Sequence, residues 1–121
     1  MRLTLELPLP ENLGNARMHW RVKLARKKAY WQTLNTLLAA KKLPKPPAEP
    51  ITPALASVHF YVWNVMDRGN AMARLKWIED WLTAHGYIAD DSPEHLDYAG
   101  FPEQTIDRRN QRVEVTVERA A

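Results

Sequence analysis

Three aspartates follow the ends of predicted secondary-structure elements, where side chains emerge into solvent. Asp67 comes just after a predicted central strand, and Asp90 and Asp91 lie in the turn after the second predicted helix. Mg²⁺ prefers carboxylate oxygens and retains several waters, so two or three carboxylates from separate loops are enough to bind it. We therefore regard these aspartates as candidate metal ligands. The alternative is that they are solvated turn residues or helix caps, because Ser92-Pro93 is an ordinary helix start.

Lys76 is the candidate cation of the same site. It lies on the second predicted helix, away from the buried arc, with Asp80 one turn later. A surface pair at this spacing contributes only a few tenths of a kcal/mol, roughly, to stability. In a catalytic role, the ammonium would instead neutralise charge on a phosphorane-like transition state, where a desolvated cation stabilises much more strongly.

Basic and acidic residues are segregated along the chain. Between residues 12 and 48 there are nine basic residues and no acidic one, whereas from residue 67 onward eleven acidic residues outnumber seven basic ones. Such segregation produces a positive face that attracts a polyanion, beside an acidic region that can bind a cation. The alternatives are a solvated helix face and a basic helix that contacts an acidic protein partner.

The apolar periodicity predicts the elements that position these residues. Alternation at Leu3, Leu5 and Leu7 predicts a strand that stops at a proline. Further strands are predicted over 54–63, 96–101 and 113–117, and a proline-rich connector over 44–53. Helices are predicted over about 20–38 and 70–85, the first with a buried stripe of Trp20, Leu24, Trp31, Leu34 and Leu38. This order predicts an α/β or α+β fold with a mixed β-sheet covered by two helices.

Composition excludes several classes of protein. The 121 residues favour a single domain, 1–121, and 45% hydrophobic with 26% charged residues exclude a disordered or fibrous chain. The absence of cysteine excludes disulfides, thiolate zinc sites and cysteine nucleophiles. No apolar run is long enough to cross a membrane, and the N-terminus lacks a signal-peptide core, so we expect a cytoplasmic location. The four histidines show no metal-ligand spacing.

The spaced combination of these residues resembles the RusA family of Holliday-junction resolvases, particularly its phage-type members. The family carries D-x-D-N at a strand end, a lysine on the next helix, a D-x-L turn, a glycine cap and a D-D pair. The chain has Asp67-Arg68-Gly69-Asn70, Lys76, Asp80-Trp81-Leu82, Gly86 and Asp90-Asp91. Its N-terminal part, Leu7-Pro8-Leu9-Pro10 with Asn15, Arg17 and His19-Trp20, is similar to the family's proline-rich strand end and asparagine loop.

The resemblance implies a RusA-like fold and a homodimeric endodeoxyribonuclease, dependent on Mg²⁺ or Mn²⁺, that resolves branched DNA such as Holliday junctions. It implies catalytic roles for Asp67, Lys76 and Asp91, with Asp67, Asp91 and Asp90 as metal ligands. The DNA-binding residues would be Asn15, Arg17, Arg21, Lys23, Lys27, Lys28 and Asn70. Gly69 replaces the second aspartate of D-x-D-N. The alternative function is therefore a catalytically weak or inactive protein that binds junction DNA.

Overall fold

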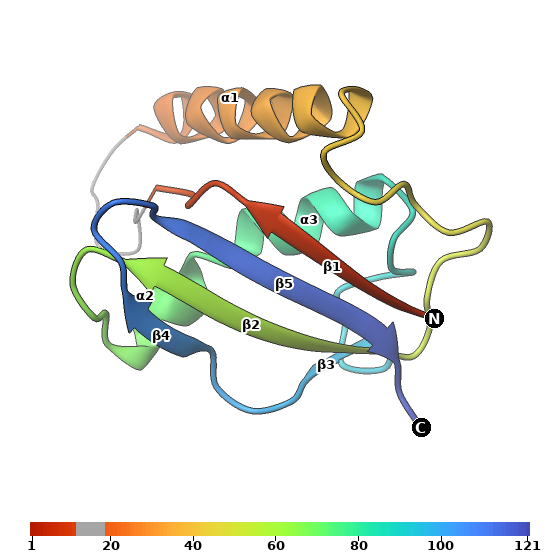
Figure 1. Ribbon diagram of the computed structural model, residues 1–121. Helices are drawn as coiled ribbons and strands as arrows, with labels where there is room; N and C mark the ends of the chain where they lie inside the picture. Colours follow the sequence, from red (N-terminus) through yellow and green to blue (C-terminus); the bar gives the residue numbers. More distant parts are fainter. Residues whose placement is uncertain (12–18) are drawn as a thin grey trace.

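Five strands form one mixed sheet in the computed structural model, which describes residues 1–11 and 19–121. Their order is β1-β5-β2, with β3 and β4 both beside β2 (Figure 1). The β1–β5 and β5–β2 pairs are antiparallel, and β2 pairs with β3 and β4 in parallel. The strands are β1 (Arg2–Leu7), β2 (Ala54–Val62), β3 (Leu96–Tyr98), β4 (Glu103–Ile106) and β5 (Arg112–Arg119). The predicted mixed sheet is confirmed, with β2 at its centre.

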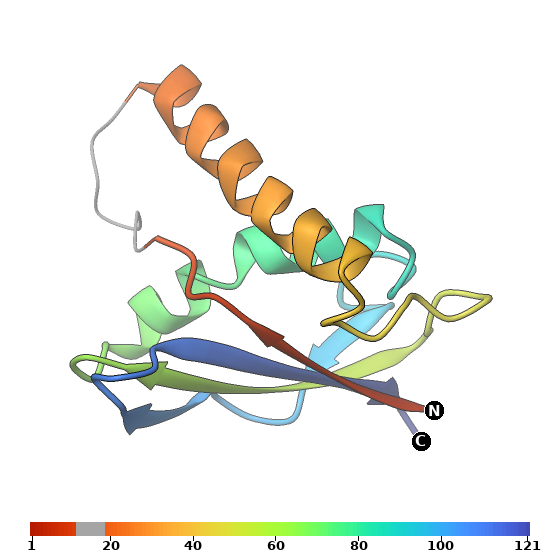
Figure 2. The ribbon, with the colours of Figure 1, turned by 45° about the horizontal axis from the view of Figure 1, so that its top comes forward.

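The helices lie on one side of this sheet (Figure 2). They are α1 (Trp20–Ala39), α2 (Arg68–Ala73) and α3 (Lys76–Ala84). Alternate residues of each strand point to that side, so Leu5, Leu7, Val58 and Phe60 are buried while their neighbours are more exposed. No helix of the described residues is both long and apolar enough to cross a membrane.

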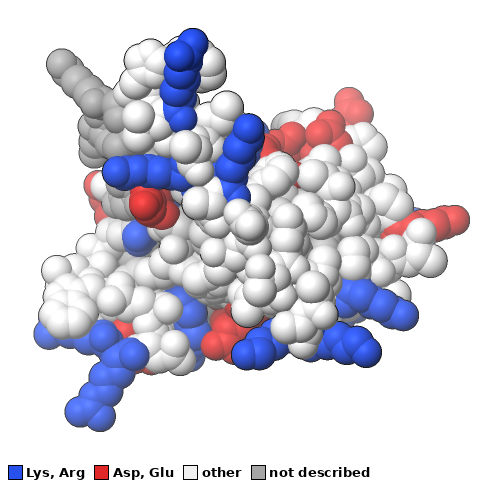
Figure 3. All heavy atoms as spheres, turned by 90° about the horizontal axis from the view of Figure 1, so that it is seen from above, with Lys and Arg blue, Asp and Glu red and all other residues white. Residues whose placement is uncertain are grey.

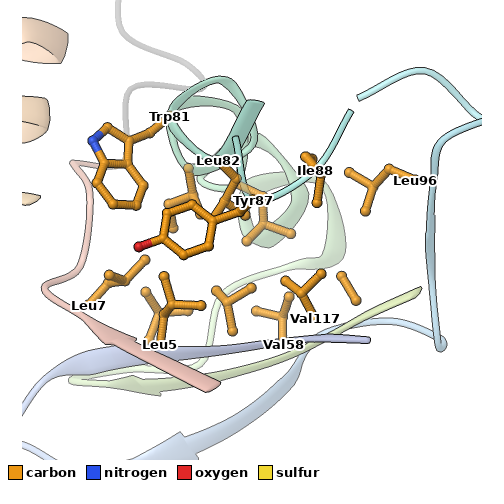
Figure 4. Packing of buried hydrophobic residues seen from close by; sticks show 14 of the residues in the cluster. Leu5, Leu7, Val58, Trp81, Leu82, Tyr87, Ile88, Leu96 and Val117 are labelled. Atoms are coloured by element: carbon orange, nitrogen blue, oxygen red, sulfur yellow. The ribbon is translucent and has the colours of Figure 1, made fainter. Parts of the chain in front are cut away.

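The apolar core fills the space between the sheet and α3 (Figure 4). Trp81 and Tyr87 are fully buried, and their rings stack with centroids 5.4 Å apart. Each also has a hydrogen-bond acceptor, because Trp81 Nε1 donates to Asn35 Oδ1 and the Tyr87 hydroxyl donates to the Pro44 carbonyl. These bonds compensate the desolvation of both polar groups and join α1 and the proline-rich connector to the core.

The first half of α1 is more exposed than its apolar periodicity predicts. Leu34 is fully buried, and Trp31 and Leu38 pack against the core, as expected. Trp20 is 63% exposed and Leu24 is 41% exposed, so their predicted burial is wrong. Figure 2 shows the reason: the start of α1 extends away from the sheet, beyond the layer that the core fills.

The segment predicted as one helix over 70–85 is two helices. Its apolar residues Ala71, Leu75, Ile78 and Leu82 are buried, as expected of one face. The helix breaks after α2, where the Leu75 N–H bonds to Met72 O, three residues back rather than four. The break makes Lys76 the first residue of α3. Gly86 follows α3 with a φ of +79°, as expected of a left-handed glycine cap.

The strand predicted over 96–101 is also interrupted. β3 ends at Tyr98, Gly100 has a φ of +106°, and a second short strand, β4, begins after Pro102. Positive φ is incompatible with a strand, and proline cannot donate to a ladder. The chain therefore leaves β2 after β3 and returns to it as β4, which the sequence pattern did not indicate.

Candidate active site

Asp67 caps the N-terminus of α2, at the end of the short turn that follows β2. Its Oδ1 accepts a hydrogen bond from the Asn70 backbone N–H at 2.8 Å, and its Oδ2 accepts one from Asn70 Nδ2 at 3.0 Å. An aspartate in this position satisfies a helix N–H that has no partner within the helix. Asp67 and Asn70, both predicted site residues, are thus hydrogen-bonded to each other, with Asp67 exposed and Asn70 half-buried.

Gly69 lies inside α2, between these two residues. Asn70 would be an ordinary N-cap residue, but Asp67 is the N-cap, so Gly69 is within the helix rather than before it. Gly69 also lacks the left-handed φ of Gly86 and Gly100. A Cβ at this position would meet Asp67 Oδ1 at 3.4 Å, which is ordinary van der Waals contact. The backbone therefore does not require glycine here.

Gln104 of β4 holds the turn that precedes Asp67. Its Oε1 accepts from the Met66 N–H at 2.7 Å, and its Nε2 donates to the Met66 carbonyl at 2.9 Å. Arg74 contacts the same residue, with Nη1 3.1 Å from Met66 Sδ, and its Nε donates to the Pro10 carbonyl. Gln104, whose backbone is in register with Phe60 of β2, thus connects β4 to the turn between β2 and α2 through its side-chain amide. No motif in the sequence indicated this role.

Lys76 lies at the centre of a chain of alternating charges. Its Nζ is 2.7 Å from Asp91 Oδ2 and 3.3 Å from Asp80 Oδ1, and Asp80 Oδ2 accepts from Lys27 Nζ at 2.8 Å. The surface pair of Lys76 and Asp80 is therefore present, as one of the two interpretations expected. The pair with Asp91 joins two predicted catalytic residues that are fifteen positions apart.

The hydrogen bond between Lys76 and Asp91 favours the charged form of both groups. It raises the pKa of the Lys76 ammonium above its ordinary value and lowers the pKa of the Asp91 carboxyl. The backbone at this position is held by a further hydrogen bond, which the Asp91 N–H donates to Asp90 Oδ1 at 2.8 Å. Lys76 is 62% exposed and Asp91 28% exposed, so the pair is open to a ligand from solvent.

Glu79 and Tyr98 are further polar residues beside this pair. The Tyr98 hydroxyl donates to Glu79 Oε1 at 2.8 Å. Burial raises the pKa of Glu79, although this hydrogen bond and the positive charge of Lys76 oppose the shift. Burial likewise raises the pKa of Tyr98. Glu79 is one turn from Lys76 on α3, and this spacing is the one signal in the sequence that pointed to it.

The predicted metal ligands do not converge in the described part of the chain. Asp90 and Asp91 are adjacent, but the contacts of Asp67 are with Asn70, and those of the Asp91 side chain are with Lys76. Residues 1–11 and 19–121 contain no group of three histidine, aspartate or glutamate side chains arranged to bind a metal ion. Carboxylates are suitable donors for Mg²⁺ or Mn²⁺, but this arrangement does not assemble them around one ion.

The predicted DNA-binding residues on α1 divide into two groups. Arg21, Lys23 and Lys28 have no ion pair within the described residues, whereas Lys27 pairs with Asp80. The neighbouring Arg26 pairs with Glu11 at 3.0 Å. Lys and Arg side chains protrude where α1 begins, at the upper left of Figure 3, and acidic side chains gather at the upper right. Asn15 and Arg17 lie outside the described residues.

Comparison with known proteins does not assign the chain to a family. No family model matches the sequence, and no curated protein is significantly similar to it.

Proposed function

We propose that this protein is an endodeoxyribonuclease that depends on Mg²⁺ or Mn²⁺ and resolves Holliday junctions or other branched DNA. It acts as a homodimer, because two symmetric strands must be cut, and it works in the cytoplasm. The proposal combines the resemblance to the RusA family with the placement of the residues that carry it.

The contact between Lys76 and Asp91 is the observation that supports the proposal best. Lys76 Nζ lies 2.7 Å from Asp91 Oδ2 in a partly exposed pair, although the two residues come from a helix and a distant turn. Through Asp80 this pair is connected to Lys27 on the basic helix α1. A phosphate held by α1 would therefore lie close to a cation and a carboxylate that are already ordered.

Each residue then has a defined task. Exposed basic residues of α1 hold backbone phosphates without reading base sequence. Lys76 neutralises charge that develops on the scissile phosphate. A divalent ion would activate water and polarise the phosphate, with Asp67, Asp90 and Asp91 supplying the oxygen donors. In the described part of the chain these donors do not converge on one position.

A second candidate function is junction binding without cleavage. It is favoured by Gly69, which supplies no carboxylate, and by the separate hydrogen-bonding partners of Asp67 and Asp91. In this case the exposed bases of α1 would retain their role, and the Lys76–Asp91 pair would stabilise only the turn after α3.

Incubation of the protein with a labelled four-way junction, with and without Mg²⁺ or Mn²⁺, separates the two functions. Symmetric nicking that needs the metal supports the nuclease. Tight binding of the junction without nicking under any metal condition supports the second candidate. Failure to bind the junction more tightly than a linear duplex contradicts both.

A further inference from the structure

The first turns of α1 carry a surface that is both apolar and exposed. Trp20 and Leu24 lie one turn apart on this helix, and neither is among the described residues that pack against the core cluster. Trp20 is the more exposed of the two, on the part of α1 that extends away from the sheet in Figure 2. We refer to Trp20 and Leu24 as the Trp20 surface. A large aromatic side chain left this accessible is typical of a binding surface.

The Trp20 surface continues the face of α1 that leads to the candidate active site. Lys27 follows Trp20 by seven residues, so it lies on the same face, two turns or about 10 Å further along the helix. Lys27 Nζ pairs with Asp80 Oδ2, and Asp80 Oδ1 lies 3.3 Å from Lys76 Nζ. An extended ligand that contacts Lys76 can therefore also reach Trp20.

The charges around the Trp20 surface favour an anionic ligand. The helix α1 has five basic residues and no acidic one. Arg21 and Lys23 have no ion pair within the described residues, and the Arg21 guanidinium lies 5.3 Å from the centroid of the Trp20 ring. A suitable ligand combines negative charge with a flat apolar surface. The phosphates and bases of a nucleic acid strand provide both.

The Trp20 ring is held by its neighbours in the chain. His19 is the N-cap of α1, and its Nδ1 accepts a hydrogen bond from the Arg21 N–H at 3.1 Å. The imidazole of His19 also stacks with the indole of Trp20, with ring centroids 5.6 Å apart and an interplanar angle of 28°. A side chain that is already ordered loses less conformational entropy when it binds.

We propose that Trp20 stacks on a base exposed at the branch point of DNA, and that this contact selects branched DNA over linear duplex. The inference rests on the proposed function, which makes branched DNA the ligand. In a linear duplex the next base pair covers each base, so Trp20 would have to unstack the helix to reach one. At a branch point the stacking between arms is interrupted, and a base is available at lower cost. Arg21 and Lys23 bind the phosphates of either DNA.

Titrations of a four-way junction and of a linear duplex with the same arm sequence test the proposal. Trp20→Ala should lower junction affinity by about tenfold or more and duplex affinity by less than about twofold, with an unchanged circular dichroism spectrum. Trp20→Phe keeps an aromatic ring and should retain most of the preference for the junction. Trp63→Ala is the matched control, because Trp63 is also exposed, at 53%, but follows β2. It should change neither affinity.

Photochemical crosslinking reports the stacking directly. Iodouracil at the branch point should crosslink to the peptide that contains Trp20, and iodouracil in the middle of an arm should not. Unchanged junction affinity in Trp20→Ala, or an equal loss for junction and duplex, would overturn the proposal. So would a Trp20→Ala variant with an altered oligomeric state in sedimentation, because the Trp20 surface would then contact a second copy.

The two proposals fail in different ways. A parent protein that prefers the junction through Trp20 but cuts no DNA under any metal condition would refute the nuclease and leave the role of Trp20 intact. A parent that cuts the junction, with Trp20→Ala equally selective, would refute only the role of Trp20. A parent that binds junction and duplex equally would refute both.

Discussion

Lys76 and Asp91 lie 2.7 Å apart, Nζ to Oδ2, and form the contact that joins α3 to the turn after it. The ammonium of Lys76 also lies 3.3 Å from Asp80, so one cation is shared by two carboxylates of different origin. Exposed pairs of this type contribute at most about 1 kcal/mol to the free energy of unfolding. The pair is therefore of more interest for the electric field at the site than for the stability of the fold.

The first prediction concerns Asp91→Asn. The amide retains the shape of the side chain but removes the charge, so junction cleavage should fall by about a hundredfold or more while junction affinity is unchanged or higher. The melting temperature should change by only a few degrees, about 2 to 4 °C, because the pair is partly exposed. Glu94→Gln is the control, since Glu94 is an exposed acid of the same turn. Cleavage at the parent rate by Asp91→Asn would exclude the assigned role.

The second prediction concerns the pH dependence of stability at Glu79. Its pKa is raised by burial, so the native state binds more protons than the unfolded state between the ordinary and the raised pKa. Stability that is present at low pH is then lost as the pH rises through the pKa of the native state. Glu79→Gln keeps an acceptor for Tyr98 and removes this loss. We expect a higher melting temperature than the parent at pH 7, and no gain below about pH 4. Thermal melts across this range provide the measurement, and a variant less stable at pH 7 would contradict the prediction.

The third prediction concerns Gly69. Since the helix does not require glycine at this position, Gly69→Ala should increase the free energy of unfolding by about 0.5 to 1 kcal/mol. Gly69→Asp adds an oxygen ligand beside Asp67 and should lower the Mg²⁺ concentration needed for half-maximal cleavage, with little change in melting temperature. Gly69→Asn is the uncharged control. If Gly69→Asp melts earlier and shows no gain in metal affinity, the missing ligand is not at this position.

The fourth prediction concerns the salt dependence of junction binding. If four to six bases contact phosphate, the logarithm of the affinity should fall with the logarithm of the salt concentration at a slope of about −4 to −5. Lys28→Ala should reduce the steepness of this slope by about 1. Arg26→Ala should reduce it less, because Arg26 already pairs with Glu11. Fluorescence titrations at several salt concentrations measure these slopes. A slope near zero for the parent would remove nucleic acid as the ligand.

The fifth prediction concerns Gln104. Loss of its two hydrogen bonds to Met66 in Gln104→Met should destabilise the protein by about 1 to 2 kcal/mol. The exposed neighbour Thr105 provides the control, as Thr105→Val keeps the backbone of β4 and removes a hydroxyl that bonds to His59. Denaturant unfolding should show a clear loss for Gln104→Met and a smaller one for Thr105→Val. Equal losses would mean that the bonds to Met66 have no special structural importance.

Local pattern in the sequence was sufficient for the longer elements, although it did not indicate the break between α2 and α3 or the separate strand β4. Alternating leucines and valines indicate β1 and β5, and the spacing of Leu34 and Leu38 indicates α1, because burial of one face imposes a period of two or of 3.6 residues. The pattern was insufficient where an element does not face the core. Trp20 has the correct spacing for burial but lies on the part of α1 that extends beyond the sheet.

For the candidate site as well, some features follow from the sequence and others depend on the tertiary structure. The sequence by itself determined that Asp67 follows a central strand, that Lys76 lies one turn before Asp80, and that basic residues are concentrated in one helix, since these features depend on neighbours in the chain. Only the tertiary structure decided that Asp91 pairs with Lys76 and Asp67 with Asn70, and that Gln104 holds Met66. These contacts join residues 15 and 38 positions apart. Their formation depends on how α3, β4 and the intervening turns pack on the sheet, which no local spacing specifies.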